Sequence, residues 1–159
     1  MAERTPSQTV GPFFHEALRW AEGGRLAPDA PGPRAALAGR IRDGSGAPVA
    51  DAMVEAWHAG ARALGRVETG ADGGFRFEFP LPPGPLAALD IAIFARGLLK
   101  AVRTRVYLAQ ESVVRTDPLL APLQSSPRLK TLVATPRSSN EFEWDVRLQG
   151  EGETVFFAP

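Results

Sequence analysis

The sequence predicts an all-β protein, an antiparallel β-sandwich of about seven or eight strands that follows an irregular N-terminal arm. Two features support this prediction. The 16 glycines and 15 prolines are spread along the chain, where they separate short segments, as in proteins with many strands joined by turns. Several of these segments alternate apolar and polar residues, which places one face of a strand in a core and the other in water.

The clearest alternation lies in Glu141–Gln149, where Phe142, Trp144, Val146 and Leu148 share one face. Six more segments are predicted as strands: Leu37–Arg42, Ala52–Trp57, Gly74–Phe79, Leu89–Phe94, Ala101–Leu108 and Leu129–Ala134. Two short stretches, Phe14–Glu22 and Gln110–Arg115, are predicted as one or two turns of helix. The second should end at Asp117-Pro118, because the residue before a proline disfavours the helical conformation.

Residues 1–35 are predicted to form an arm and residues 36–159 the sandwich. Five prolines, at positions 6, 12, 28, 31 and 33, prevent regular strand pairing in most of the arm. The arm nevertheless carries Phe13, Phe14 and Trp20, which a solvated tail would not usually contain. Two alternatives stay open: the arm packs on its own sandwich, or it docks on another chain.

Composition excludes several classes of function. The 18 basic and 18 acidic residues balance, so the chain lacks the positive excess that attracts nucleic acid or anionic lipid. The absence of cysteine excludes disulfides and thiolate metal sites. No apolar run is long enough for a membrane span, and the first ten residues lack the apolar stretch of a signal peptide. We therefore expect a cytoplasmic protein.

The residues that could bind a metal are few. The chain has two histidines, His15 and His58, and one tyrosine, Tyr107. No H-x-H or H-E-x-x-H motif occurs, and no motif places a carboxylate near both histidines. We expect His58 to be a surface residue after a strand and Tyr107 to be structural. These residues alone indicate an all-β domain, for which an interaction module is one alternative.

A resemblance to a known family takes the prediction further. The segments of this chain that carry the resemblance are Thr5–His15, Gly39–Gly44, Asp51–Trp57, Phe94–Lys100, Thr104–Tyr107, Lys130–Ala134 and Asp145–Phe157. In order and over nearly the whole chain, they resemble the alpha chains of the protocatechuate 3,4-dioxygenases, which belong to the intradiol ring-cleavage dioxygenases. The resemblance implies an intradiol dioxygenase-like β-sandwich.

The resemblance also implies that this chain and its partner chain have different roles in the enzyme. In this family, the catalytic chain binds Fe(III) through two tyrosinates and two histidines, the latter in an H-x-H pair. This chain has one tyrosine, and where the pair would fall it reads Ala87-Ala88-Leu89-Asp90-Ile91. The resemblance therefore implies a non-catalytic alpha subunit with no catalytic or metal-binding residue of its own. Fe(III) would be bound by a beta subunit, in a hetero-oligomer that cleaves protocatechuate with O₂ to 3-carboxy-cis,cis-muconate in the beta-ketoadipate pathway.

By the same resemblance, five residues of this chain approach the catechol pocket of the beta subunit. They are Thr9, Gly11, Pro12, Phe13 and Arg96. The family usually has a tyrosine where this chain has Phe13, which leaves the exact catechol open. The alternative for Arg96 is a surface arginine in a loop. The alternative for the whole chain is a transthyretin-like binding module without an enzyme partner, which a neighbouring gene for an H-x-H chain would argue against.

Overall fold

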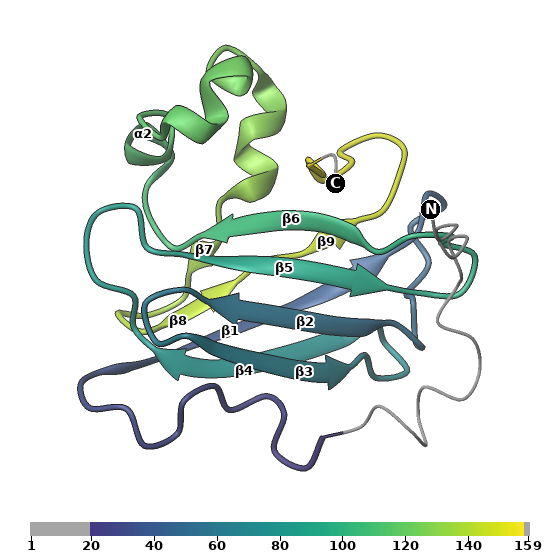
Figure 1. Cartoon of the computed structure of the whole chain (residues 1–159). Helices are drawn as coiled ribbons and strands as arrows, with labels where there is room; N and C mark the ends of the chain where they lie inside the picture. The colour runs from purple at the N-terminus through teal and green to yellow at the C-terminus, as the bar shows by residue number, and fades with distance from the viewer. Residues whose placement is uncertain (1–19, 158–159) are drawn as a thin grey trace, which may run out of the picture.

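The computed structural model describes residues 20–157, which form a sandwich of two β-sheets with a helical segment over one end (Figure 1). One sheet has the strand order β4 (Gly74–Pro80), β1 (Arg34–Arg42), β8 (Glu141–Glu143) and β7 (Thr135–Pro136), with β9 (Val146–Arg147) also paired to β1. The other has the order β3 (Ala63–Glu68), β2 (Met53–His58), β5 (Ala88–Phe94) and β6 (Val102–Tyr107). The predicted all-β sandwich is confirmed.

The core lies between the two sheets, where the alternation of the sequence places it. In β4, Phe75, Phe77 and Phe79 are buried and the intervening residues face outward. In β5, Leu89, Ile91 and Ile93 are likewise buried between the sheets. Burying such side chains stabilises the fold by about 1.5–3 kcal/mol each. The sandwich is therefore held chiefly by the inward-facing residues of these strands.

The predicted strand 141–149 is interrupted at Trp144, and its pairing with β1 is parallel rather than antiparallel. The Trp144 amide donates to the carbonyl of Ala38 at 2.9 Å, and its indole packs edge-on against Phe75. A Cβ at Gly39 would lie 1.8 Å from the Trp144 carbonyl oxygen. This close approach of two backbones therefore requires glycine at position 39.

The segment after β6 is helical, which corrects one prediction. The short helix α2 (Glu111–Val114) lies where Gln110–Arg115 was predicted, and two 3-10 helices follow, η1 (Pro118–Leu123) and η2 (Pro127–Leu132). The expected strand Leu129–Ala134 is wrong, because Pro127 begins η2 and the Ser126 hydroxyl accepts a hydrogen bond from the Arg128 amide as its N-cap. Among the described residues, no helix is long and apolar enough to cross a membrane.

Strand β3 was not predicted, because Gly65 interrupts any alternation of apolar and polar side chains and the large apolar Leu64 is exposed. It pairs with β2 along its whole length, from Ala63 opposite His58 to Glu68 opposite Met53. It forms an edge of the four-stranded sheet. An edge strand exposes unpaired backbone groups unless another segment covers it.

Residues 20–33 cover this edge as a strap, drawn in purple along the lower side of the sandwich in Figure 1. The Gly23 carbonyl accepts from the Arg66 amide of β3 at 2.8 Å, and the Gly24 carbonyl accepts from the Glu78 amide of β4 at 2.7 Å. Leu26 is buried between them. The strap thus joins the edges of both sheets. The described part of the predicted helix Phe14–Glu22 is a turn, and the rest lies outside the described residues.

Candidate functional site

Four of the five predicted pocket-wall residues lie outside the described residues. They are Thr9, Gly11, Pro12 and Phe13. His15, which was not predicted as a pocket residue, also lies outside the described residues. The fifth, Arg96, lies in the loop after β5, one residue before Gly97, whose positive φ of 86° turns the chain. The described chain begins at Trp20, at the edge of the four-stranded sheet.

The Arg96 side chain is 68% exposed and forms an ion pair with Asp51, which precedes β2. Its Nε donates to the Asp51 carboxylate. Asp51 is largely covered, so the pair holds the guanidinium at the end of the sheet where β5 finishes. An exposed arginine in this position can present its remaining N–H groups to an anion on another molecule.

His58 is buried, which corrects the expectation that it is a surface residue. Its Nδ1 accepts a hydrogen bond from the Ala61 amide at 2.9 Å, and its Nε2 lies 2.8 Å from the carbonyl oxygen of Pro80. The two partners select the tautomer with the proton on Nε2. Both ring nitrogens are engaged, so His58 holds the turn between β2 and β3 and offers no lone pair to a metal.

Tyr107 is fully buried and ties the helical segment to the sheet. Its hydroxyl donates to Asp117 Oδ2 at 2.6 Å, and Asp117 Oδ1 accepts from the Leu119 amide at 2.8 Å, at the start of η1. Burial, then the bond to Asp117, raises the pKa of Tyr107 to about 12. The phenol is therefore protonated near neutral pH and serves as a donor. This is the structural role expected from the sequence.

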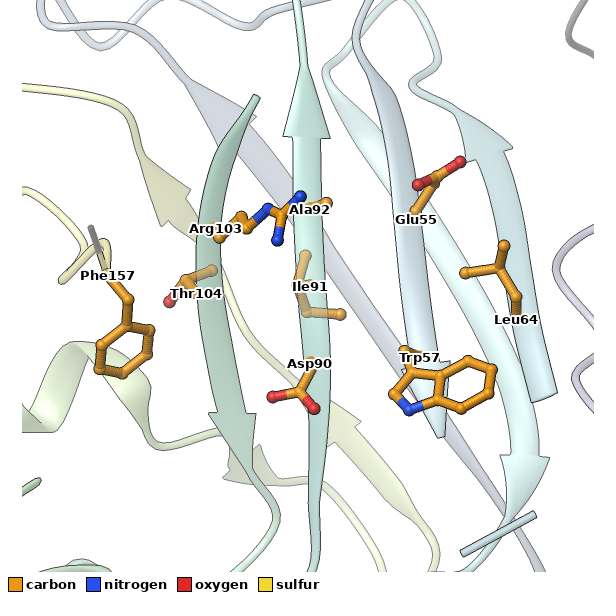
Figure 2. A pocket seen from close by; sticks show the side chains of 9 residues that line it. All are labelled: Glu55, Trp57, Leu64, Asp90, Ile91, Ala92, Arg103, Thr104 and Phe157. Atoms are coloured by element: carbon orange, nitrogen blue, oxygen red, sulfur yellow. The ribbon is translucent and has the colours of Figure 1, made fainter. Parts of the chain in front are cut away.

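The outer face of the four-stranded sheet carries a hollow of about 410 Å³ (Figure 2). Nine residues line it: Glu55, Trp57, Leu64, Asp90, Ile91, Ala92, Arg103, Thr104 and Phe157. Figure 2 shows Trp57 and Leu64 on one side, Thr104 and Phe157 on the other, and the guanidinium of Arg103 extending from β6 toward Ala92. Beside the hollow, the helical segment covers the same sheet face over Tyr107 and Ala88.

The charges around the hollow are paired with one exception. The Arg66 Nε donates to Glu55 at 2.9 Å, and the Arg105 Nε donates to Asp90 at 2.7 Å. The hydrogen bond that Arg105 donates to Asp90 raises the pKa of Arg105 above its usual value. Arg103 has no counter-ion or side-chain hydrogen bond within the described part of the chain. The hollow therefore carries one uncompensated positive charge.

The hollow lies over the segment where the resemblance would place an H-x-H pair. Ala88 and Asp90 are two residues apart in β5 and face outward on the same side, as a pair of ligands would. Ala88 cannot ligate a metal, and Asp90 is engaged by Arg105. Across residues 20–157, no three His, Cys, Asp or Glu side chains converge as a metal site would need.

Sequence reasoning did not single out Trp57, Arg103 or Phe157 as site residues. Trp57 is 39% exposed and Leu64 41% exposed, although both are large and apolar. A signal for Trp57 was present, since it occupies the polar phase of β2, between the buried Ala56 and His58. The sequence contained no such indication for Phe157. Its position beside β6 depends on an antiparallel backbone pairing with Arg103, which is distant in sequence.

Comparison with known proteins gives close relatives of the whole chain. No protein-family model matches the sequence. The protocatechuate 3,4-dioxygenase alpha chain of Pseudomonas putida is 34% identical over 191 aligned residues, with 96% of this chain and 95% of the relative covered. The alpha chain of the same name from Burkholderia cepacia is 34% identical over 192, with 98% and 97% covered.

Solved structures show the same fold at lower identity. The dioxygenase domain of a dioxygenase carbohydrate-binding protein fusion from Streptomyces sp. SirexAA-E has a TM-score of 0.61 at 21% identity, covering 93% of this chain and 99% of that one. An intradiol ring-cleavage dioxygenase from Tetranychus urticae has a TM-score of 0.59 at 16% identity, with 92% and 94% covered. Catechol 1,2-dioxygenase from Acinetobacter sp. ADP1 has a TM-score of 0.58 at 19% identity, with 85% and 60% covered.

Proposed function

This chain belongs to the family of protocatechuate 3,4-dioxygenase alpha chains, and from that premise we propose that it is a non-catalytic subunit that completes the active site of an iron-bearing beta-type partner. The assembled enzyme would insert both atoms of O₂ into protocatechuate, between the two carbons that carry the hydroxyls, and release 3-carboxy-cis,cis-muconate. The observation that carries the proposal is a full-length match to alpha chains by a chain that lacks a set of iron ligands.

The residues present here do not fit a ferric site of two tyrosinates and two histidines. The chain has one tyrosine, Tyr107, whose buried hydroxyl is bonded to Asp117. Both nitrogens of His58 are engaged by backbone groups. The ferric iron that activates the bound catecholate toward O₂ would accordingly belong to the partner.

The contribution of this chain would be to shape and charge the partner's pocket. The arm residues Thr9, Gly11, Pro12 and Phe13 would form part of its wall, and Arg96 would approach the substrate. Arg96 has the chemistry for this, because its guanidinium is exposed and stays ionised when it is partly desolvated. A fixed positive charge near the pocket would stabilise the carboxylate of protocatechuate and the charge of the bound catecholate.

Co-expression with an adjacent gene that encodes an H-x-H chain tests the proposal. We expect a stable complex with iron and ring-cleaving activity, and a colourless, iron-free protein when this chain is purified alone. The colour matters because tyrosinate bound to ferric iron absorbs visible light. Stoichiometric iron in the single chain would contradict the proposal. A complex that never forms would favour a binding module without an enzyme partner.

Deletion of residues 1–12 separates the role of the arm from that of the sandwich. The first described strand begins at Arg34 and the strap at Trp20, so the fold should survive. The complex should retain iron and its size but lose turnover, since the deleted residues would wall the pocket. Full activity after the deletion would show that the arm has no part in the active site.

A further inference from the structure

The hollow on the outer face of the four-stranded sheet has the features of a small-molecule site. We propose that it binds a hydroxylated aromatic carboxylate of one ring, as a second, non-catalytic site carried by this chain. The carboxylate would bind Arg103, the ring would lie over Ala92 beside Trp57, and a ring hydroxyl would donate to Asp90. All four residues line the same hollow (Figure 2).

The size and lining of the hollow suit an aromatic ring. Its volume of about 410 Å³ lies within the range of small-molecule sites, roughly 300–1,000 Å³. Trp57 and Leu64 leave large apolar surfaces exposed along one wall, and Phe157 forms the other. Ala92 is short, so the floor between β2 and β6 is open where a longer side chain would fill it. An aromatic ligand gains both area burial and ring contacts in such a place.

The uncompensated positive charge of the hollow favours an anionic ligand. Glu55 and Asp90 are each held by an arginine, Arg66 and Arg105, which cancels their charges. Arg103 is exposed and has no counter-ion among residues 20–157. A guanidinium binds a carboxylate through two parallel N–H···O bonds, which fixes the orientation of the ligand as well as its charge.

A hydroxyl group on the ring would find an acceptor in Asp90. One carboxylate oxygen, Oδ1, accepts from the Arg105 Nε, and the side chain is still 43% exposed. The second oxygen is therefore available to accept a hydrogen bond from a phenol. Because Asp90 and Arg103 lie on neighbouring strands, a ligand with a hydroxyl and a carboxylate on one ring can address both. Benzoate, which lacks the hydroxyl, can address only Arg103.

This site differs from the proposed pocket wall in the partner. The Arg96 loop follows the end of β5, whereas the hollow lies over the middle of the sheet. Binding at the hollow and completion of a partner's active site are separate properties, because the first needs only this chain. A chain that does not bind the ligand at the hollow could still complete a partner's active site, and the reverse also holds.

Isothermal titration calorimetry of the full-length chain with 4-hydroxybenzoate and with benzoate tests the proposal. Neither compound has the two adjacent hydroxyls that ring cleavage requires, so binding is measured without turnover. We expect one site per chain, with 4-hydroxybenzoate bound more tightly. Arg103→Gln should weaken both ligands about tenfold to a hundredfold, as for the loss of a charged hydrogen bond. Asp90→Ala should abolish the preference for the hydroxylated ligand.

The matched control is Arg76→Gln, which removes the same charge from the outer face of the other sheet. It should bind both ligands as the unmodified chain does. Absence of saturable binding for both ligands would overturn the proposal, as would equal losses in Arg103→Gln and Arg76→Gln, which would indicate attraction by net charge alone. A hydroxyl preference that persists in Asp90→Ala would overturn the role of Asp90.

Discussion

The indole of Trp20 lies over the guanidinium of Arg66, whose central carbon is 4.4 Å from the ring centroid. The same guanidinium pairs with Glu55 at the rim of the hollow, and the Arg66 amide donates to Gly23. Arg66 of β3 therefore contacts both Trp20, where the described chain begins, and Glu55, which lines the hollow. Trp20 is the first residue of the strap, which joins the edges of both sheets.

Replacing Trp20 should loosen this anchor without unfolding the sandwich. A cation–π contact at an exposed site contributes about 0.5–1 kcal/mol, so Trp20→Ala should lower the free energy of unfolding by that amount. Urea unfolding measures the change, and Trp20→Phe should recover part of it. The double variant Trp20→Ala/Arg66→Gln should lose less than the sum of the single changes. Strict additivity would show that the two side chains do not interact.

Arg96 can be tested against its ion-pair partner. The pair with Asp51 is exposed on the arginine side, so Arg96→Ala should change stability by less than about 1 kcal/mol. In the assembled complex, it should lower kcat/KM about tenfold to a hundredfold, because a charged contact to the substrate is lost. Arg96→Lys should recover only part of this.

The control for Arg96 is Asp51→Asn, which removes the counter-ion and keeps the guanidinium. If Arg96 acts on the substrate, Asp51→Asn should retain most of the activity. Equal losses in Arg96→Ala and Asp51→Asn would mean that the ion pair serves only the shape of the loop. Iron content and complex size should be unchanged in all three variants.

Tyr107 should resist ionisation in the folded chain. Its pKa is raised to about 12, above the ordinary value of 10. The stability that its protonated form contributes is therefore complete below about pH 10 and is lost as pH rises toward 12. Since the sequence contains a single tyrosine, the ultraviolet absorbance of tyrosinate reports on this residue alone. A titration midpoint near 10 in the folded chain would contradict the buried bond to Asp117.

The same bond predicts the result of Tyr107→Phe. The variant leaves the Asp117 carboxylate without its donor in a buried place, which should lower the free energy of unfolding by about 1–3 kcal/mol. The loss should disappear at high pH, where the wild-type phenol is itself ionised. Thr116→Ala is a suitable control, because its hydroxyl makes a local bond to Val113 on the exposed side of the same segment.

Gly39→Ala should be among the more damaging small substitutions. The new Cβ would meet the Trp144 carbonyl oxygen, so β1 and the segment after β8 would have to separate. We expect a loss of at least about 1–3 kcal/mol, the usual range for overpacking. Gly70→Ala lies in an exposed turn where the nearest atom to the new Cβ, Asp72 Oδ1, is 3.3 Å away, and it should change stability little. Equal midpoints in urea would contradict the close approach.

The local pattern of the sequence determined the strands with a regular period and the inner face of the sandwich. The phenylalanines of β4 and the alternation of β6 predicted both, because the direction of a side chain in a strand depends only on its place in the strand. The composition also determined that a single tyrosine cannot supply two tyrosinate ligands.

Tertiary contacts decided the rest. The parallel pairing of β1 with β8 and β9 joins residues about a hundred positions apart, and no local period reports such a partner. Leu129–Leu132 has residues that suit a strand, yet it is helical because Ser126 and Pro127 start a turn whose leucines pack over Tyr107. The hollow likewise exists only because Trp57, Asp90, Arg103 and Phe157 come from three strands and the C-terminal segment. Side chains so distant in sequence share a site only after the sheet has formed, which is why composition and period alone did not identify it.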